Sequence, residues 1–440
     1  MRLHHPRFSV LRISLFAAAV WPAVSVVAQL LPSPGSIIAG NNNPIVIRAE
    51  DAPLSVPGVA TQRAAVKVSE GEWGKLEYFP IFLEAPSHLV DRFPLPSPKP
   101  RWVLPASAGD DLAAFFREHG LSDAEATLLA NSRENLREGD FVYVFPPPAL
   151  VEGLSRDVRA KLYRTLRKIP LNEYHADPVL VTEGTVESWF ATAELRPELV
   201  QMISRLSYVR GETLAFSDLP LLMGLAQGEA EARSIMKALT RTRSLIVKMV
   251  LDSSISVPNI MKYWTTGLNL RRKDVEPMLH SVIETQGADK LDILHLLPAM
   301  PRKYVMTYPD FSLGLEGTFP DCHWTSLNFF NYTVEPYLLD SRLATTAVLE
   351  RFNPVEPPYR FGDILFFLDA ETGDAFHSCV HIADDIVFTK NGRNLLSPWI
   401  FTRVEDVRKV YLFDGNGRIQ GFRNKKAPTA DSDFSATSGM

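Results

Sequence analysis

The sequence predicts an α+β protein in which β-rich and helical segments follow one another along the chain. Short strand patterns bounded by turn residues occur at 44–49, 64–68 and 75–83. Helix patterns with recognisable ends dominate residues 106–305. The last hundred residues before the tail combine one helix start with three strand patterns. We therefore expect this C-terminal module to be a helix packed on an antiparallel sheet.

The composition excludes several classes of protein. The chain has 440 residues, of which 46% are hydrophobic and 22% charged, so it can bury large cores. Its formal net charge of −5 argues against electrostatic binding of nucleic acid. Two cysteines, Cys322 and Cys379, are too few for a disulfide-rich scaffold or a four-cysteine zinc site. A single disulfide, a reactive thiol or two inert core residues remain open.

Residues 1–28 have the pattern of a signal peptide. Three arginines precede an apolar stretch at 13–27, and small residues at its end suit signal-peptidase cleavage after Ala28. The stretch is shorter than the roughly 20 residues that a membrane-spanning helix needs. We therefore expect an exported protein, periplasmic or extracellular, with no stable membrane anchor after cleavage.

The next two segments are expected to differ in secondary structure. Residues 29–105 are predicted to form a β-rich N-terminal region and a connector, because six prolines between 86 and 105 disfavour a regular helix. We place a domain boundary in this connector. Residues 106–305 are predicted to form a mainly helical region. Its expected elements are helices at 155–169, 186–195, 197–206, 229–240, 257–266 and 273–285, and strands at 141–145 and 244–251.

The predicted helix at 155–169 is amphipathic. Val158, Leu162 and Leu166 share one face, which we expect to be buried. The other face carries six basic residues, among them Arg159. Because acidic residues nearby balance this charge, we expect the basic face to be solvated rather than to bind phosphate or nucleic acid.

The chemistry concentrates around Cys322. Asp321 is a good helix N-cap, which places Cys322 in the first helical turn. Unpaired backbone N–H groups and the helix dipole favour a thiolate there, whereas the Asp321 carboxylate opposes it. A histidine partner is therefore needed to make Cys322 a useful nucleophile.

Such a histidine occurs on the second of three predicted strands. The strands lie at 361–369, from 376 to a hairpin at 384–385, and after this hairpin. With a side-chain period of two, His377, Cys379 and His381 share one face of the second strand. We expect that face to be polar and reactive and the opposite face to belong to the core.

This segment resembles the NlpC-type cell-wall peptidases of the papain-like cysteine peptidase superfamily. The resemblance rests on Asp321-Cys322, on the Gly-Asp-apolar-apolar-Phe-Phe run at 362–367, and on His377, which occur in the order of the family. It implies a papain-like module at 306–422, about a quarter of the chain. It also implies a thiol hydrolase whose substrate is an amide or peptide bond, with peptidoglycan stem peptides as the family's substrate, or a related acyl transferase.

The resemblance also implies roles for individual residues. Cys322 would be the nucleophile and His377 the base. A third, polar residue would hold the imidazole; Thr389 and Asn391 share a face of the next strand, and we favour Asn391 because its amide can accept from the imidazole N–H. No cofactor is expected. The residues expected to line the substrate pocket are His323, Trp324, Cys379, His381 and Thr389.

Two alternatives to the hydrolase stay open. A Cys322–Cys379 disulfide would suit a non-catalytic secreted binding or structural protein. A zinc site could use Cys322, His377, Cys379 and His381, but strand residues four apart are about 13 Å apart, which strains this ligand set. The tail at 423–440 is polar and expected to be disordered.

Overall fold

The computed structural model describes residues 54–58, 65–252, 254–265, 272–314 and 317–427. Within these ranges the protein is mixed α and β with antiparallel sheets, as an α+β fold requires. None of the described helices is long and apolar enough to cross a membrane.

Three predictions concern residues outside the described ranges. These are the signal peptide at 1–28, the strand pattern at 44–49 and most of the tail at 423–440. The first residues of that predicted tail are described, and they are ordered in a strand that runs to Asn424. This strand pairs with a neighbouring strand of a sheet. The backbone hydrogen bonds of that pairing order these residues, although their composition alone predicts disorder.

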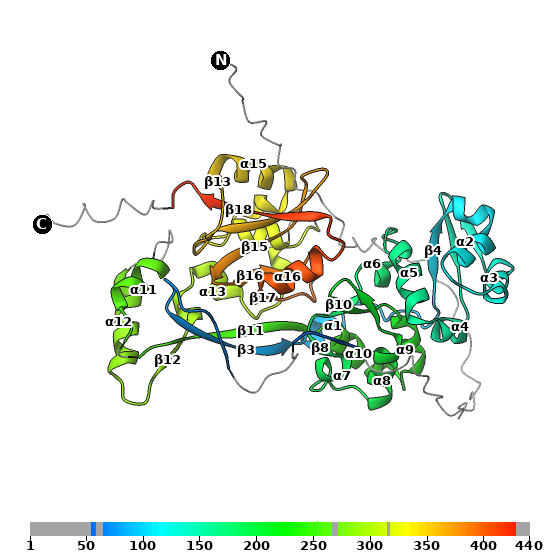
Figure 1. Cartoon of the computed structure of the whole chain (residues 1–440), viewed down its shortest axis with the longest axis horizontal. Helices are drawn as coiled ribbons and strands as arrows, with labels where there is room; N and C mark the ends of the chain where they lie inside the picture. Colours follow the sequence, from blue (N-terminus) through cyan, green and yellow to red (C-terminus); the bar gives the residue numbers. More distant parts are fainter. Residues whose placement is uncertain (1–53, 59–64, 253, 266–271, 315–316, 428–440) are drawn as a thin grey trace, which may run out of the picture.

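A six-stranded antiparallel sheet forms the C-terminal part of the protein (Figure 1). Its strands, in order across the sheet, are β13 (Phe352–Val355), β18 (Gly417–Asn424), β14 (Ile364–Asp369), β15 (Ala375–Ala383), β16 (Ile386–Lys390) and β17 (Trp399–Arg403). The three predicted strands are confirmed as β14, β15 and β16. The hairpin between β15 and β16 is confirmed as well, with Asp384 at a positive φ of 50°.

Both faces of this sheet are covered. Helix α14 (Cys322–Leu327) packs on the face of Val380 and Ile382, where its Trp324 and Leu327 join the same core. Helix α16 (Val404–Tyr411) packs on the other face. The predicted packing of a helix on an antiparallel sheet is therefore present, but the second helix leaves no open polar face.

A four-stranded antiparallel sheet runs past the C-terminal sheet, and its two long central strands form a ribbon (Figure 1). Strand β3 (Lys75–Leu83) pairs along its whole length with β11 (Thr242–Val250), and β2 (Val66–Lys67) and β12 (Lys290–Asp292) flank the pair. The predicted strand at 75–83 has these bounds, and the strand expected at 244–251 is shifted by one or two residues.

The remaining strands form three small sheets, and helices account for most of the middle of the chain. The small sheets are β4 (Trp102–Pro105) with β6 (Phe141–Val144) and β5 (Leu136–Glu138); β7 (Val179–Val181) with β10 (Thr213–Phe216) and β9 (Tyr208–Arg210); and β1 (Ser55–Val56) with β8 (Gly184–Thr185). The helices outside the C-terminal sheet are α1 (Ser87–Val90), α2 (Leu112–Glu118), α3 (Asp123–Ala130), α4 (Pro148–Gly153), α5 (Arg156–Leu166), α6 (Glu173–Ala176), α7 (Val186–Trp189), α8 (Pro197–Leu206), α9 (Leu219–Leu225), α10 (Glu229–Leu239), α11 (Val257–Trp264), α12 (Arg272–Glu284) and α13 (Ala299–Tyr304), and α15 (Ser341–Arg351) precedes β13.

Two large cores organise these elements. The first unites the ribbon, α11, α12 and the C-terminal sheet, including α14. The second takes residues from 85 to 239 and one leucine from the C-terminal sheet region, Leu396. The cores therefore do not follow the expected segment boundaries at 105 and 305, because β3 and β11 bring distant parts of the chain into one sheet.

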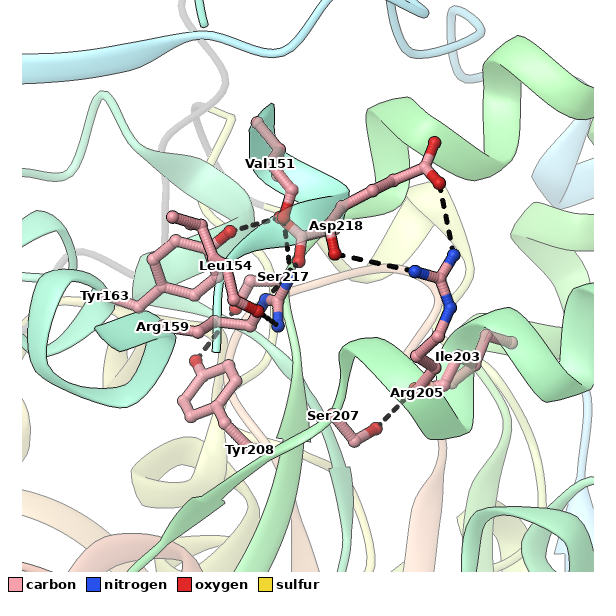
Figure 2. Close-up of polar contacts among 11 residues, drawn as sticks. Val151, Leu154, Arg159, Tyr163, Ile203, Arg205, Ser207, Tyr208, Ser217 and Asp218 are labelled. Atoms are coloured by element: carbon pink, nitrogen blue, oxygen red, sulfur yellow. Dashed lines mark hydrogen bonds and ion pairs between the residues drawn. The ribbon is translucent and has the colours of Figure 1, made fainter. Parts of the chain in front are cut away.

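Arg159 is buried, which corrects the prediction of a fully solvated basic face on α5. Its side chain is 1% exposed, and its Nε donates to Asp218 Oδ2 at 3.1 Å (Figure 2). The remaining guanidinium nitrogens donate to the carbonyls of Leu154 and Val151, and Tyr163 Oη donates to Asp218 Oδ1 at 2.5 Å. Every charge in this cluster has a partner, which makes its burial tolerable.

We expect Arg159→Met to lower the free energy of unfolding by about 3–5 kcal/mol, because it leaves the Asp218 carboxylate buried without its cation. Urea titration measures this loss. Arg164→Met on the exposed side of α5 is the matched control and should stay within about 0.5 kcal/mol of the parent protein. Equal stability of the two variants would contradict the structural role of this ion pair.

Candidate active site

Helix α14 begins as the sequence predicts. The Asp321 carboxylate accepts a hydrogen bond from the Trp324 backbone N–H at 2.8 Å, which confirms Asp321 as the N-cap. Cys322 is the first residue of the helix. Thr325, one turn on, accepts a hydrogen bond at 2.9 Å from the indole N–H of Trp399 and so attaches α14 to β17.

The Cys322 thiol lies where β15 and β16 separate. The ladder between these strands ends at the pair Val380 and Phe388. Beyond that pair, the Ser378 carbonyl accepts a hydrogen bond from the Thr389 hydroxyl at 3.0 Å. The Ser378 backbone N–H bonds to the Cys322 sulfur. The Cys322 sulfur therefore accepts a backbone hydrogen bond from β15 at the point where β15 no longer pairs with β16.

Cys322 is a neutral thiol in this environment. Its side chain is 5% exposed, and burial, reinforced by the Asp321 carboxylate, raises the pKa of the thiol to about 12. Backbone N–H groups of Ser378 and His323 and the charge of Lys390 oppose this rise without overcoming it. The expected stabilisation of a thiolate by the helix start is thus outweighed, because α14 has only six residues and the sulfur is desolvated.

His377 is held as a neutral imidazole on the opposite face of β15. Its ring is 0% exposed and stacks on Tyr411 of α16, with ring centroids 4.0 Å apart. Its Nε2 lies 3.2 Å from Thr389 Oγ1. Burial holds the pKa of His377 well below its usual value.

The hydrogen-bond network assigns the tautomer of His377. The Thr389 hydroxyl has one proton, which it donates to the Ser378 carbonyl, so it can only accept from His377. Nε2 must then carry the proton, and Nδ1 is left as a bare lone pair. Nδ1 is buried and has no partner among the described residues.

The predicted catalytic residues are thus brought together only in part. Thr389 contacts His377, whereas Asn391, the favoured third residue, does not; the Asn391 Oδ1 is buried with no partner among the described residues. No hydrogen bond joins the Cys322 thiol to His377 in the part of the chain that is described. The side-chain period places both Thr389 and Asn391 on one face, so the sequence does not show which of them contacts His377. The structure shows that it is Thr389.

The other residues expected to line a substrate pocket are packed in the protein interior. His323 Nδ1 lies 3.1 Å from Ser378 Oγ, and Trp324 packs beside Trp399. Cys379 is 0% exposed in a small core beneath α16, and His381 Nε2 donates to the Asp384 carbonyl in the hairpin. The face of His377, Cys379 and His381 was expected to be polar and reactive. Helix α16 covers it at His377 and Cys379, and His381 is buried at the hairpin.

Lys390 is a component of the site that the sequence reasoning missed. It ends β16, is 0% exposed, and its Nζ donates to the carbonyls of Gly392 and Asn394 at 2.7 and 2.9 Å. Burial lowers the pKa of Lys390 to about 7, although the charges of Asp321 and Cys322 act to raise it. The strand period was a usable signal, because Lys390 lies two residues after Phe388, which is in the core.

The structure has neither the Cys322–Cys379 disulfide nor the zinc site that the sequence left open, as far as its described residues go. Both cysteines are free and buried thiols. Among the described residues, no group of three or more His, Cys, Asp or Glu side chains could hold a metal ion. No protein-family model, curated protein or solved structure matches this chain. Function must therefore be inferred from the side chains of the site.

We expect alkylation of Cys322 in the native protein at pH 8 to be at least about a hundredfold slower than in denaturant, because little thiolate forms at a pKa of about 12. Iodoacetamide labelling followed by mass spectrometry measures both rates. In denaturant without reductant, two thiols should label per chain. Fewer than two would indicate a disulfide and contradict the free-thiol structure.

Proposed function

We propose that this protein is a thiol hydrolase that cleaves an amide or peptide bond, with Cys322 as nucleophile and His377 as general base. The observation that supports this best is the state of His377. Its Nε2–H is directed to Thr389, and its Nδ1 keeps an unprotonated lone pair. A general base needs such a nitrogen, and an orienting partner on the other ring nitrogen fixes the tautomer.

In the proposed reaction His377 Nδ1 takes the Cys322 proton, and the thiolate attacks the carbonyl carbon of the amide. The imidazolium then protonates the leaving amine, and a thioester remains on the sulfur. Water hydrolyses this thioester with His377 again as the base; an amine in place of water would make the reaction an acyl transfer. Thr389 holds the imidazole through both steps.

The site must open before substrate can enter. Cys322 is 5% exposed, and the loop at 391–398 lies against the start of α14 through an ion pair of 3.2 Å between Arg393 and Asp321. Displacing this loop would admit substrate to Cys322. For the proton transfer the sulfur must also reach His377 through the gap between β15 and β16, because the two side chains lie on opposite faces of β15. Catalytic hydrogen bonds that are long in an unliganded enzyme commonly tighten when substrate binds.

Peptidoglycan stem peptides are the substrate that we propose, on the strength of the sequence resemblance and of the expected export. Purified muropeptides and unrelated peptides of matched length are the two arms of the test, with amide cleavage followed by mass spectrometry.

A second candidate, a non-catalytic protein that binds a partner or glycan, is favoured by one observation: Cys322, His377 and Thr389 are all nearly inaccessible. Binding of muropeptides without cleavage would support that candidate.

We expect Cys322→Ala to abolish amide cleavage and His377→Ala to lower it by about 10²–10⁴-fold, because nucleophile and base are then missing. Cys379→Ala is the matched control; it removes the other buried thiol, which lies in a core beneath α16, and should keep the activity. Cleavage by folded Cys322→Ala at the parental rate would refute the proposed function.

Thr389 and Asn391 give a second test. We expect Thr389→Val to lower kcat by about tenfold or more, because the Nε2–H loses its acceptor and the tautomer is no longer fixed. Thr389→Ser keeps the hydroxyl and should retain most of the rate. Asn391→Ala should have the smaller effect, since Asn391 does not bond to His377. A larger loss for Asn391→Ala than for Thr389→Val would reverse this assignment.

A further inference from the structure

Lys390 is a fully buried cationic side chain that the proposed mechanism does not use. Its Nζ donates to Gly392 O and Asn394 O, and no third acceptor for it occurs among the described residues. A buried ammonium is costly unless its charge is used or compensated. The two carbonyls alone compensate it poorly, since both are neutral.

The strand geometry directs Lys390 toward α14. Phe388, two residues earlier on β16, belongs to the core that contains α14, and the side-chain period places Lys390 on that same face. Lys390 Nζ lies 5.9 Å from the ring centroid of Trp399, whose indole bonds to Thr325 in α14. The ammonium therefore lies on the face of the sheet on which α14 packs, close enough to Asp321 and Cys322 to interact with both electrostatically.

The charges around Lys390 leave one positive charge uncompensated. From α14, Asp321 and Cys322 face it, and both interact with it electrostatically. Asp321 is already paired with Arg393 from the loop after β16. Trp399 from β17 and Ser378 from β15 bring no charge. The remaining positive charge is thus placed next to a thiol.

We propose that Lys390 is the electrostatic partner of the Cys322 thiolate, a positioning residue that makes ionisation of this buried sulfur possible. The inference rests on the proposed role of Cys322 as nucleophile. The Cys322 proton moves to His377 Nδ1, and Lys390 keeps its own protons throughout. A thiolate then forms beside an ammonium instead of in an uncompensated apolar site, which lowers its energy relative to the thiol.

This role has a pH signature. Because burial lowers the pKa of Lys390 to about 7, its ammonium form declines above neutral pH in the free enzyme. The value of kcat/KM reports groups of the free enzyme, so it should fall on the alkaline side as Lys390 loses its proton. Lys390→Arg keeps its charge and should retain activity to higher pH.

The test compares four variants in a Cys379→Ala background: Lys390→Gln, Lys390→Arg, Asp321→Asn and the Lys390→Gln/Asp321→Asn pair. The first readout is the rate of Cys322 alkylation by iodoacetamide from pH 6 to 10. We expect Lys390→Gln to slow it by about tenfold between pH 6 and 7, where the parent Lys390 is charged, and the difference to disappear at higher pH. Asp321→Asn, which keeps a side chain able to cap the helix, should accelerate it. The double variant should return close to the parent, because the two charges act on one sulfur with opposite sign.

The second readout is the pH profile of kcat/KM, with melting temperature as the check on folding. Lys390→Gln keeps a hydrogen-bond donor for the loop, so a purely structural lysine would leave alkylation and pH profile unchanged in this variant. That result would overturn the inference. The proposed function fails by a different result, namely amide cleavage by Cys322→Ala, so the two failures are distinguishable.

Discussion

The pairing of β3 with β11 is the constraint on which the rest of the structure depends. It joins segments far apart in the sequence and contributes to the core beneath the C-terminal sheet. From β11, Arg243 bonds to Asp406 of α16 at 3.3 Å and to Glu183 of the helical region at 2.9 Å, all three nearly buried. Helix α16 in turn places Tyr411 against His377. The orientation of the proposed base thus depends on a strand outside the C-terminal module.

Desolvation dominates the chemistry of the site. It raises the pKa of Cys322 and lowers the pKa of His377, so these two groups are neutral, and it lowers the pKa of Lys390 to about 7, so the ammonium form persists up to neutral pH. A neutral thiol, a neutral imidazole and an ammonium that donates to two carbonyls are compatible with a closed interior. In the proposed reaction the thiolate forms together with an imidazolium, and the Lys390 ammonium lies on the side of the sulfur to stabilise the new negative charge. The desolvation that keeps the thiol and the imidazole neutral would therefore make their ionisation depend on a neighbouring cation.

The predictions that were confirmed depend on residues close together in sequence. The Asp321 cap, the strand at 75–83 and the hairpin after β15 follow from capping and turn chemistry. The errors have distant causes. Arg159 was expected to be solvated because Asp218 lies far along the chain. The face of His377 was expected to be polar and reactive because nothing near it in sequence indicates that α16 covers it.

The loop after β16 links the site to the helical region. Leu396 in this loop is 4% exposed and lies in the core formed by residues 85–239, although its neighbours in sequence belong to the C-terminal sheet. Swinging the loop outward must either extract this leucine, at about 2 kcal/mol, or drag the helical region with it. The loop is therefore anchored to the core formed by residues 85–239. A movement of that core relative to the C-terminal sheet would also move the loop, and with it the solvent exposure of Cys322.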